Sequence, residues 1–195
     1  MSRIKSAVGA LERRLAGQAW FFHAYTFPYR ALLRRELRLA AVQPDDVLLN
    51  IGCGSAPFSA VLAAQFSGAR VIAVDMDPRA VTGARSLVAG LGLSSRIEVV
   101  LADAANDPLP PASVALVALQ AAPKDDIWQN LRHSLSESGN RGRALFRIPR
   151  AGLESEYGHF TPGTAVRGEV YHRMPTFERT ILCAVRADRS VCKVA

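Results

Sequence analysis

The sequence predicts an α/β fold, a doubly wound and mainly parallel sheet with a helical N-terminal cap and an antiparallel strand pair at the C-terminus. Short apolar runs, typical of strands buried on both faces, alternate with amphipathic helical segments. A glycine turn, Gly52-Cys53-Gly54, follows the first of these runs. An acid, Asp75, ends the second run about twenty residues later, where parallel nucleotide-binding sheets carry one.

Length and composition are those of a globular domain. A chain of 195 residues can bury a substantial core, and its 49% hydrophobic and 21% charged residues are ordinary values. No apolar run is long enough for a membrane span or a signal peptide. Cys53, Cys183 and Cys192 have no pairing pattern, so we expect reduced thiols in a cytoplasmic protein. The histidines are scattered, and we expect no metal site.

Positive charge is concentrated at the N-terminus. Of the net charge of +7, residues 1–43 contribute +6, from eight Lys and Arg against two Glu. We therefore expect two parts, a basic helical cap over residues 1–43 and an α/β domain over 44–195.

The N-terminal part is predicted to hold two helices. Apolar residues recur at helical spacing between Ile4 and Leu15, and an aromatic cluster follows from Trp20 to Tyr29. Pro28 is expected to start the second helix. Its apolar side would carry Leu32, Leu33, Leu37 and Leu39, and its basic side Arg30, Arg34, Arg35 and Arg38. This cap could pack on the main domain with its arginines in water, close over a substrate pocket, or dock on a membrane surface or nucleic acid.

The first two β/α units follow from local signals. Residues 47–51 form a buried strand, Pro57 opens a helix to residue 66, and Gly68 caps it. A second strand covers residues 70–75. Asp77 is predicted as the N-cap, and Pro78 as the first residue, of a helix over 78–90.

The remaining elements are assigned in the same way. Strands are expected over 96–103, 113–120 and 142–148, and helix over 124–135. The strand over 113–120 is apolar without interruption from Val114 to Leu119, which predicts a central position. The C-terminal part leaves this alternation, with a loop or short helix over 151–163 and strands over 166–174 and 176–187. In a doubly wound sheet, ligands bind at the carboxyl ends of the strands, where Gly52, Gly54, Asp75, Asp103 and Gln120 are placed.

Over roughly residues 45–150 the chain resembles the class I S-adenosylmethionine (SAM)-dependent methyltransferases, which have a Rossmann-like sheet. The segments LLNIGCGSAP, VIAVDMDPRAV and IEVVLADAAN are similar to three family motifs in order. The resemblance implies SAM as cofactor, with Gly52, Cys53, Gly54 and Pro57 near its methionine part. It also implies Asp75 on the ribose, Met76 on the adenine, Asp103 and Ala104 at the adenine edge, and Gln120 in the reaction pocket.

The turn also resembles that of nicotianamine synthases and related opine-metallophore enzymes. They share the fold but transfer the 3-amino-3-carboxypropyl group of SAM. The similarity lies in Pro57 and Ser59 after the turn, in ALQAAPKDDIWQNL, and in YTFPYRALLRREL before it. Those enzymes carry active-site Tyr and Glu residues in a helical N-terminal part. Tyr25 and Tyr29 are therefore the candidate catalytic residues, and Glu36 lies in the same segment.

Three functions remain open at this point. Methyl transfer to a small-molecule acceptor is favoured, and aminocarboxypropyl transfer to an amine is the alternative. The third is a non-catalytic protein that docks on an acidic surface through residues 1–43. No nucleic-acid substrate motif stands out, so we expect a small acceptor and at most a weak membrane contact. In either transfer an acceptor amine must be unprotonated, and a nearby Tyr or Glu could take its proton.

Overall fold

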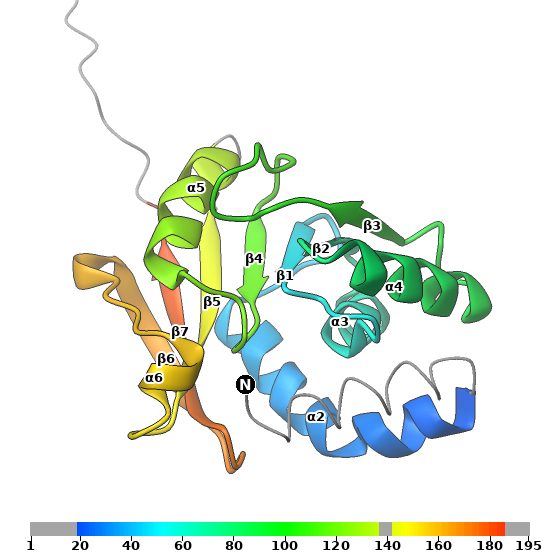
Figure 1. Cartoon of the computed structure of the whole chain (residues 1–195), viewed down its shortest axis with the longest axis horizontal. Helices are drawn as coiled ribbons and strands as arrows, with labels where there is room; N and C mark the ends of the chain where they lie inside the picture. Colours follow the sequence, from blue (N-terminus) through cyan, green and yellow to red (C-terminus); the bar gives the residue numbers. More distant parts are fainter. Residues whose placement is uncertain (1–18, 137–141, 186–195) are drawn as a thin grey trace, which may run out of the picture.

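The protein is described by a computed structural model, which covers residues 19–136 and 142–185 (Figure 1), with side chains described from residue 29 onward. The expected helix between residues 4 and 15 falls outside this range. The helices are α2 (Ala19–Leu39), α3 (Phe58–Ser67), α4 (Pro78–Gly90), α5 (Lys124–Ser136) and α6 (Glu154–Tyr157), with a 3-10 turn η2 (Gly163–Ala165). The strands are β1 (Val47–Ile51), β2 (Arg70–Asp75), β3 (Ile97–Leu101), β4 (Val114–Val117), β5 (Arg143–Pro149), β6 (Val166–Tyr171) and β7 (Phe177–Ala184).

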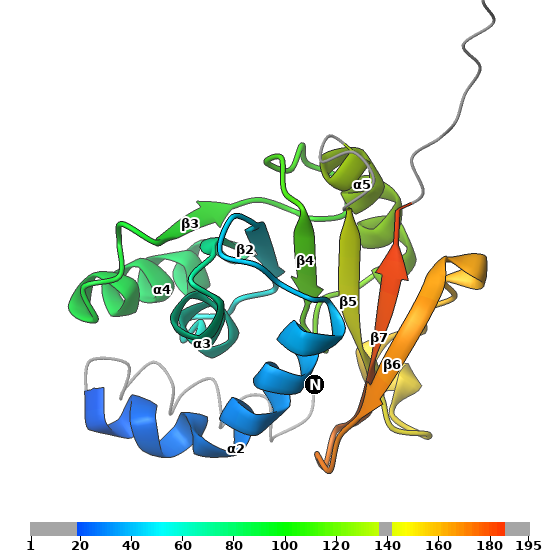
Figure 2. The ribbon, with the colours of Figure 1, turned by 180° about the vertical axis from the view of Figure 1, so that it is seen from behind.

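These strands form one sheet in the order β3-β2-β1-β4-β5-β7-β6. The first five strands along the chain are parallel to one another. β7 lies between β5 and β6 and is antiparallel to both, as Figure 2 shows. The predicted fold class is therefore confirmed, including the antiparallel C-terminal pair.

Helices cover both faces of the sheet. Alternate strand residues point to opposite faces, so Leu48 and Leu145 pack in one core cluster, whereas Leu49 and Phe146 pack in the other. The first cluster includes apolar residues of α2, α3 and α4. The second includes α5, whose Trp128 meets Phe146 edge-on at 5.8 Å between ring centroids. Phe146 also stacks on Phe160, at 4.0 Å between centroids.

Helix α2 differs from the prediction, because it runs through Pro28 instead of starting there. Proline removes one backbone hydrogen bond and favours a kink in a helix interior, and α2 bends between its two halves (Figures 1 and 2). Leu32, Leu33 and Leu37 are buried, so packing supports the helix beyond the proline. None of the helices in the described ranges combines the length and apolar character needed to cross a membrane.

Several boundaries were predicted correctly. Asp77 caps α4 by accepting a hydrogen bond from Arg79 N, with Pro78 following, and Gly68 ends α3 in a left-handed conformation. The strand expected over 113–120 was too long. β4 stops at Val117 because Ala121 N donates to Ala118 O and the chain turns there.

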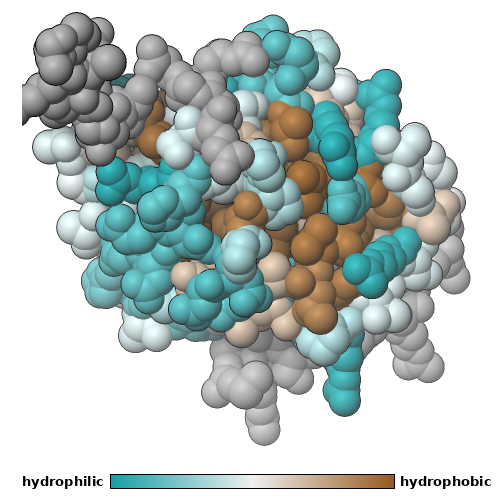
Figure 3. Space-filling model, turned by 90° about the horizontal axis from the view of Figure 1, so that it is seen from above, coloured by the Kyte–Doolittle hydropathy of each residue, from teal (hydrophilic) through white to brown (hydrophobic). Residues whose placement is uncertain are grey.

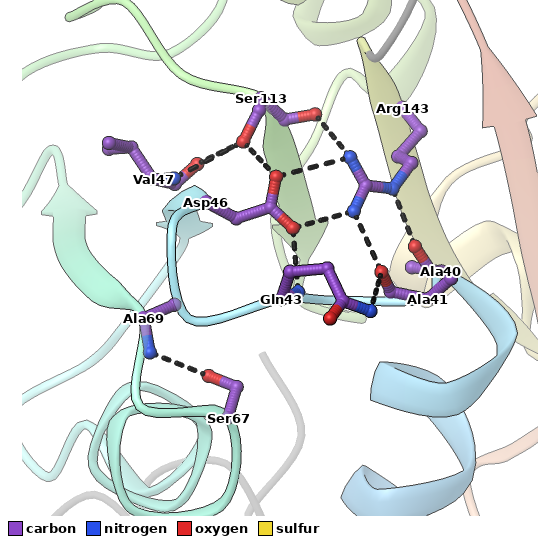
Figure 4. Close-up of polar contacts among 9 residues, drawn as sticks. All are labelled: Ala40, Ala41, Gln43, Asp46, Val47, Ser67, Ala69, Ser113 and Arg143. Carbon is purple, nitrogen blue, oxygen red and sulfur yellow. Dashed lines mark hydrogen bonds and ion pairs between the residues drawn. The ribbon is translucent and has the colours of Figure 1, made fainter.

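The C-terminal end of α2 is tied to the amino-terminal edge of the sheet by a polar cluster (Figure 4). Arg143 on β5 donates to the carbonyls of Ala40 and Ala41 and pairs with Asp46 at 2.7 Å. Burial alone would raise the pKa of Asp46. Hydrogen bonds from Arg143, Ser113 and Gln43 N lower this pKa below its usual value. The cluster joins α2, β1, β4 and β5 at one point.

Candidate functional site

The glycine turn after β1 lies against the end of β2. Gly52 N and Cys53 N both donate to Val74 O, at 2.9 and 3.1 Å. Gly52 has φ +72, and a Cβ there would lie 3.1 Å from the Cβ of Ala121, so packing requires glycine. Gly54 has φ +68, and a Cβ there would meet nothing within 4 Å. The turn is therefore packed at Gly52 and open at Gly54, where a ligand can approach the backbone.

Asp75 joins this turn to the start of α4. Its Oδ2 accepts from Gly54 N at 2.7 Å, and its Oδ1 accepts from Asp77 N at 3.0 Å. Each carboxylate oxygen has more than one lone pair, so Asp75 holds the turn and can still accept hydrogen bonds from a ligand.

Two solvent-exposed apolar side chains flank Asp75. Met76 is 65% exposed and Leu101, which pairs with Asp75 across β2 and β3, is 50% exposed. The resemblance to the methyltransferases implies Met76 as a site residue but does not include Leu101, which in the sequence looks like one more residue of a buried strand. Large exposed hydrophobic residues next to a carboxylate fit a ligand with a flat apolar ring and hydroxyl groups.

Asp103 organises the loop after β3. Its carboxylate accepts from Ala105 N and from the Asn106 side chain, both at 2.9 Å, and these bonds lower its pKa. Asn130 of α5 donates to Ala104 O at 3.0 Å and so fixes the same loop. A contact of Asp103 or Ala104 with a ligand stays a prediction.

The last members of the predicted set also border the turn. Gln120 Nε2 donates to Gly52 O at 3.1 Å and thereby connects the loop after β4 to the turn. Pro57 is buried at the N-cap of α3. Cys53 is buried too, and burial raises the pKa of its thiol to about 12. The thiol therefore stays protonated near neutral pH and is no nucleophile.

A buried polar network, which we call the Glu36 network, joins α2 to β5, to β7 and to the first turn of α3. It consists of Glu36, Arg147, Ser59, Thr180 and His172. The Glu36 carboxylate accepts two hydrogen bonds from the Arg147 guanidinium, at 2.9 and 2.8 Å, and one from Thr180 Oγ1 at 2.7 Å. Arg147 Nη2 also donates to Ser59 Oγ at 3.2 Å. Ser59 lies in the first turn of α3, directly after the glycine turn.

Of the candidate catalytic tyrosines, Tyr29 is half-buried near this network. Burial lowers the pKa of the Arg147 guanidinium, but Glu36 outweighs it and raises that pKa above its ordinary value, and Tyr29 adds to the rise. The Tyr25 side chain falls outside the described residues. Sequence reasoning did not find the network. Its visible signal was Arg147, a charged residue directly after the apolar run of residues 144–146, but nothing in the local sequence indicates a partner 111 residues away.

In the described part of the chain, no group of three or more His, Cys, Asp or Glu side chains could hold a metal ion. The candidate binding features are instead the open glycine turn, the acid at the end of β2 and the apolar pair beside it. Figure 3 shows one face of the molecule, on which apolar side chains gather in the middle and polar ones surround them.

The strand order, the glycine turn and Asp75 together define the fold of the class I SAM-dependent methyltransferases. Residues 48–139 match the family described as "Methyltransferase domain". The chain is also similar to an L-histidine 2-aminobutanoyltransferase of Yersinia pestis, 33% identical over 76 residues. That match covers 39% of this chain and only 29% of the length of the relative.

Solved structures share the fold. A variant of the nicotianamine synthase MtNAS in complex with S-adenosylmethionine superposes with a TM-score of 0.76 at 20% identity, over 91% of this chain and 72% of that chain. An RNA methyltransferase from Salinibacter ruber in complex with S-adenosyl-L-homocysteine gives a TM-score of 0.62 at 19% identity, over 84% of this chain and 95% of that one. The structural similarity therefore extends to a nicotianamine synthase and to a methyltransferase.

Proposed function

We propose that this protein is a SAM-dependent transferase that moves the 3-amino-3-carboxypropyl group to an amine of a small acceptor. One observation carries the proposal: the Glu36 network fixes α2 to β5 and, through Arg147, to the start of α3, the helix that follows the glycine turn. The likeness to the synthase supports it, since a match over 91% of the chain must extend beyond residues 44–195 into the helical part. The Yersinia pestis relative, named for transfer of a 2-aminobutanoyl group, supports it as well.

The turn and its surroundings fit SAM. We assign Asp75 to the ribose hydroxyls, because its oxygens keep free lone pairs. The exposed side chains of Met76 and Leu101 would lie on the adenine. The open side of Gly54 would accommodate the methionine part. Further proposed contacts are those of Gly52, Cys53, Pro57, Asp103, Ala104 and Gln120.

When bound, SAM supplies a carbon next to a sulfonium, whose sulfur leaves as a neutral thioether. The chain must therefore orient the acceptor, exclude water and take up the proton that the amine loses. Tyr29, half-buried beside Arg147, is the proposed proton acceptor. Tyr25 lies one helical turn earlier and is the second candidate.

Product analysis tests the proposal. The purified chain is incubated with SAM and a panel of amines that includes L-histidine, and the spent cofactor is identified by mass spectrometry. We expect 5′-methylthioadenosine, and an Asp75→Ala variant should form none. S-adenosylhomocysteine would instead establish methyl transfer, the second candidate, which the methyltransferase domain over residues 48–139 favours. Neither product with any acceptor would overturn both reactions.

A membrane-surface contact is proposed as a weaker, additional property. Arg34, Arg35 and Arg38 are exposed on α2, although Arg34 also stacks on Phe66 at 4.2 Å. Binding to anionic vesicles should fall when these three arginines are changed to glutamate, and remain when Arg79 and Arg96 are changed instead. Binding that is equal for both variants would contradict it. We propose a cytoplasmic location, which the free thiols of Cys53 and Cys183 support.

A further inference from the structure

His172 and Thr180 occupy the inner end of the Glu36 network, away from the glycine turn. His172 follows β6, and its side chain is only 2% exposed. Its Nε2 lies 2.9 Å from Thr180 Oγ1, which in turn lies 2.7 Å from Glu36 Oε1. A continuous line of polar contacts therefore runs from β6 through β7 and α2 to Arg147 and Ser59.

The direction of each hydrogen bond in this line follows from chemistry. A hydroxyl has one proton, and a carboxylate can only accept, so Thr180 donates to Glu36. His172 must then donate to Thr180, which places its proton on Nε2. The other ring nitrogen, Nδ1, is buried and has no hydrogen-bond partner in the described part of the chain. A second proton on Nδ1 would be a buried donor without an acceptor, which is costly.

The charges around the ring also favour its neutral form. Arg147 of β5 and Arg35 of α2 act on it, and Glu36 of α2 lies 3.9 Å from Nε2. Burial lowers the pKa of His172, both arginines lower it further, and Glu36 opposes them. Protonation would compete with Arg147 for Glu36 and so disturb the contact of Arg147 with Ser59.

We infer that neutral His172 is a positioning residue, which acts through Thr180 to align Glu36 and Arg147 and so holds Ser59 and the helix α2, which carries Tyr29, for group transfer. This inference rests on the proposed function. His172 touches no reacting atom. Its protonation would release the alignment, so group transfer would become slower as the pH falls.

Two matched variants of Thr180 separate alignment from packing. Thr180→Ser keeps the hydroxyl, whereas Thr180→Val keeps the shape and loses it. We expect Thr180→Val to lower kcat about tenfold with the SAM affinity unchanged. Thr180→Ser should retain most of the kcat of the unaltered chain. His172→Gln keeps a donor but cannot titrate, so the fall of kcat at acid pH should flatten. Equal kcat in both Thr180 variants, or a pH profile of kcat in His172→Gln identical to that of the unaltered chain, would overturn the inference.

A measurement without turnover keeps this test distinct from that of the proposed function. Long-range ¹⁵N–¹H spectra of the full chain, with His172→Gln for assignment, report the tautomer and titration of His172. We expect an Nε2–H tautomer that protonates below the ordinary histidine pKa of about 6.5. An Nδ1–H tautomer, or titration at the ordinary value, would overturn the inference even if the enzyme formed the expected product. Absence of any product would instead overturn the proposed function.

Discussion

The buried pair of Glu36 and Arg147 allows a quantitative test of what fixes α2 on the sheet. The Glu36 side chain is 0% exposed and that of Arg147 is 8% exposed, and two hydrogen bonds join them. Removing one partner leaves a charge buried without compensation, which costs about 3–5 kcal/mol. For a chain of this length that corresponds to a fall in Tm of roughly 6–20 °C.

The assay is urea unfolding at pH 7 of Glu36→Gln, Arg147→Met and the double variant Glu36→Leu/Arg147→Met. Each single change should lower the free energy of unfolding by about 3–5 kcal/mol. The double variant should recover most of the loss, because it removes both charges and loses only the hydrogen bonds that Thr180 and Ser59 make to the pair.

A surface pair provides the matched control. Arg70 and Glu98 are 2.7 Å apart, as close as the buried pair, but their side chains are 61% and 53% exposed. Arg70→Met should therefore change the free energy of unfolding by less than about 1 kcal/mol. If Glu36→Gln cost no more than Arg70→Met, burial would not be what makes the inner pair important, and the reasoning would fail.

Three further predictions concern the turn and the edge of the sheet. Asp75→Ala should abolish the rise in Tm on addition of SAM. Asp77→Ala should lower the free energy of unfolding by about 1 kcal/mol, because the α4 cap is lost, yet keep that rise in Tm. A rise in Tm retained by Asp75→Ala would contradict the ribose assignment. Gly52→Ala should destabilise the fold by about 1–3 kcal/mol in urea, since its φ is +72 and Ala121 is close, while Gly90→Ala, with open space, should not. The lowered pKa of Asp46 means that its stabilisation is present above pH about 4 and is lost as the pH falls through the folded-state pKa, so acid unfolding of Asp46→Asn should start from a lower stability and depend less on pH.

Much of the α/β fold could be predicted because its signals are local. A strand buried on both faces needs an apolar run, and a cap needs Asp77 before Pro78, so these elements are visible in short windows. Pro28 misled the prediction of α2 because its local effect opposes the tertiary packing of the leucines beyond it. The end of β4 was misplaced for a related reason, since Ala118 and Leu119 continue the apolar run but the chain turns toward Gly52 there.

The same distinction between local and tertiary signals applies to the candidate site. The turn and Asp75 are found from sequence because the spacing of consecutive β/α units fixes which strand ends are neighbours. Leu101 was missed because exposure at a strand end is not encoded in its residue type. The pairing of Glu36 with Arg147 was missed because nothing in either local segment indicates a partner 111 residues away, until α2 and β5 are brought together.

The two arginines of β5 explain how the cap and the sheet become one unit. Arg143 and Arg147 are four residues apart, so they point to the same face of the strand. Arg143 holds the end of α2 at the amino-terminal edge through Ala40 and Ala41, and Arg147 holds its middle through Glu36. A helix fixed at two separated points on one strand cannot rotate about either of them. Any group on α2 that faces the glycine turn is therefore held at a set distance from it, which is what orienting an acceptor requires.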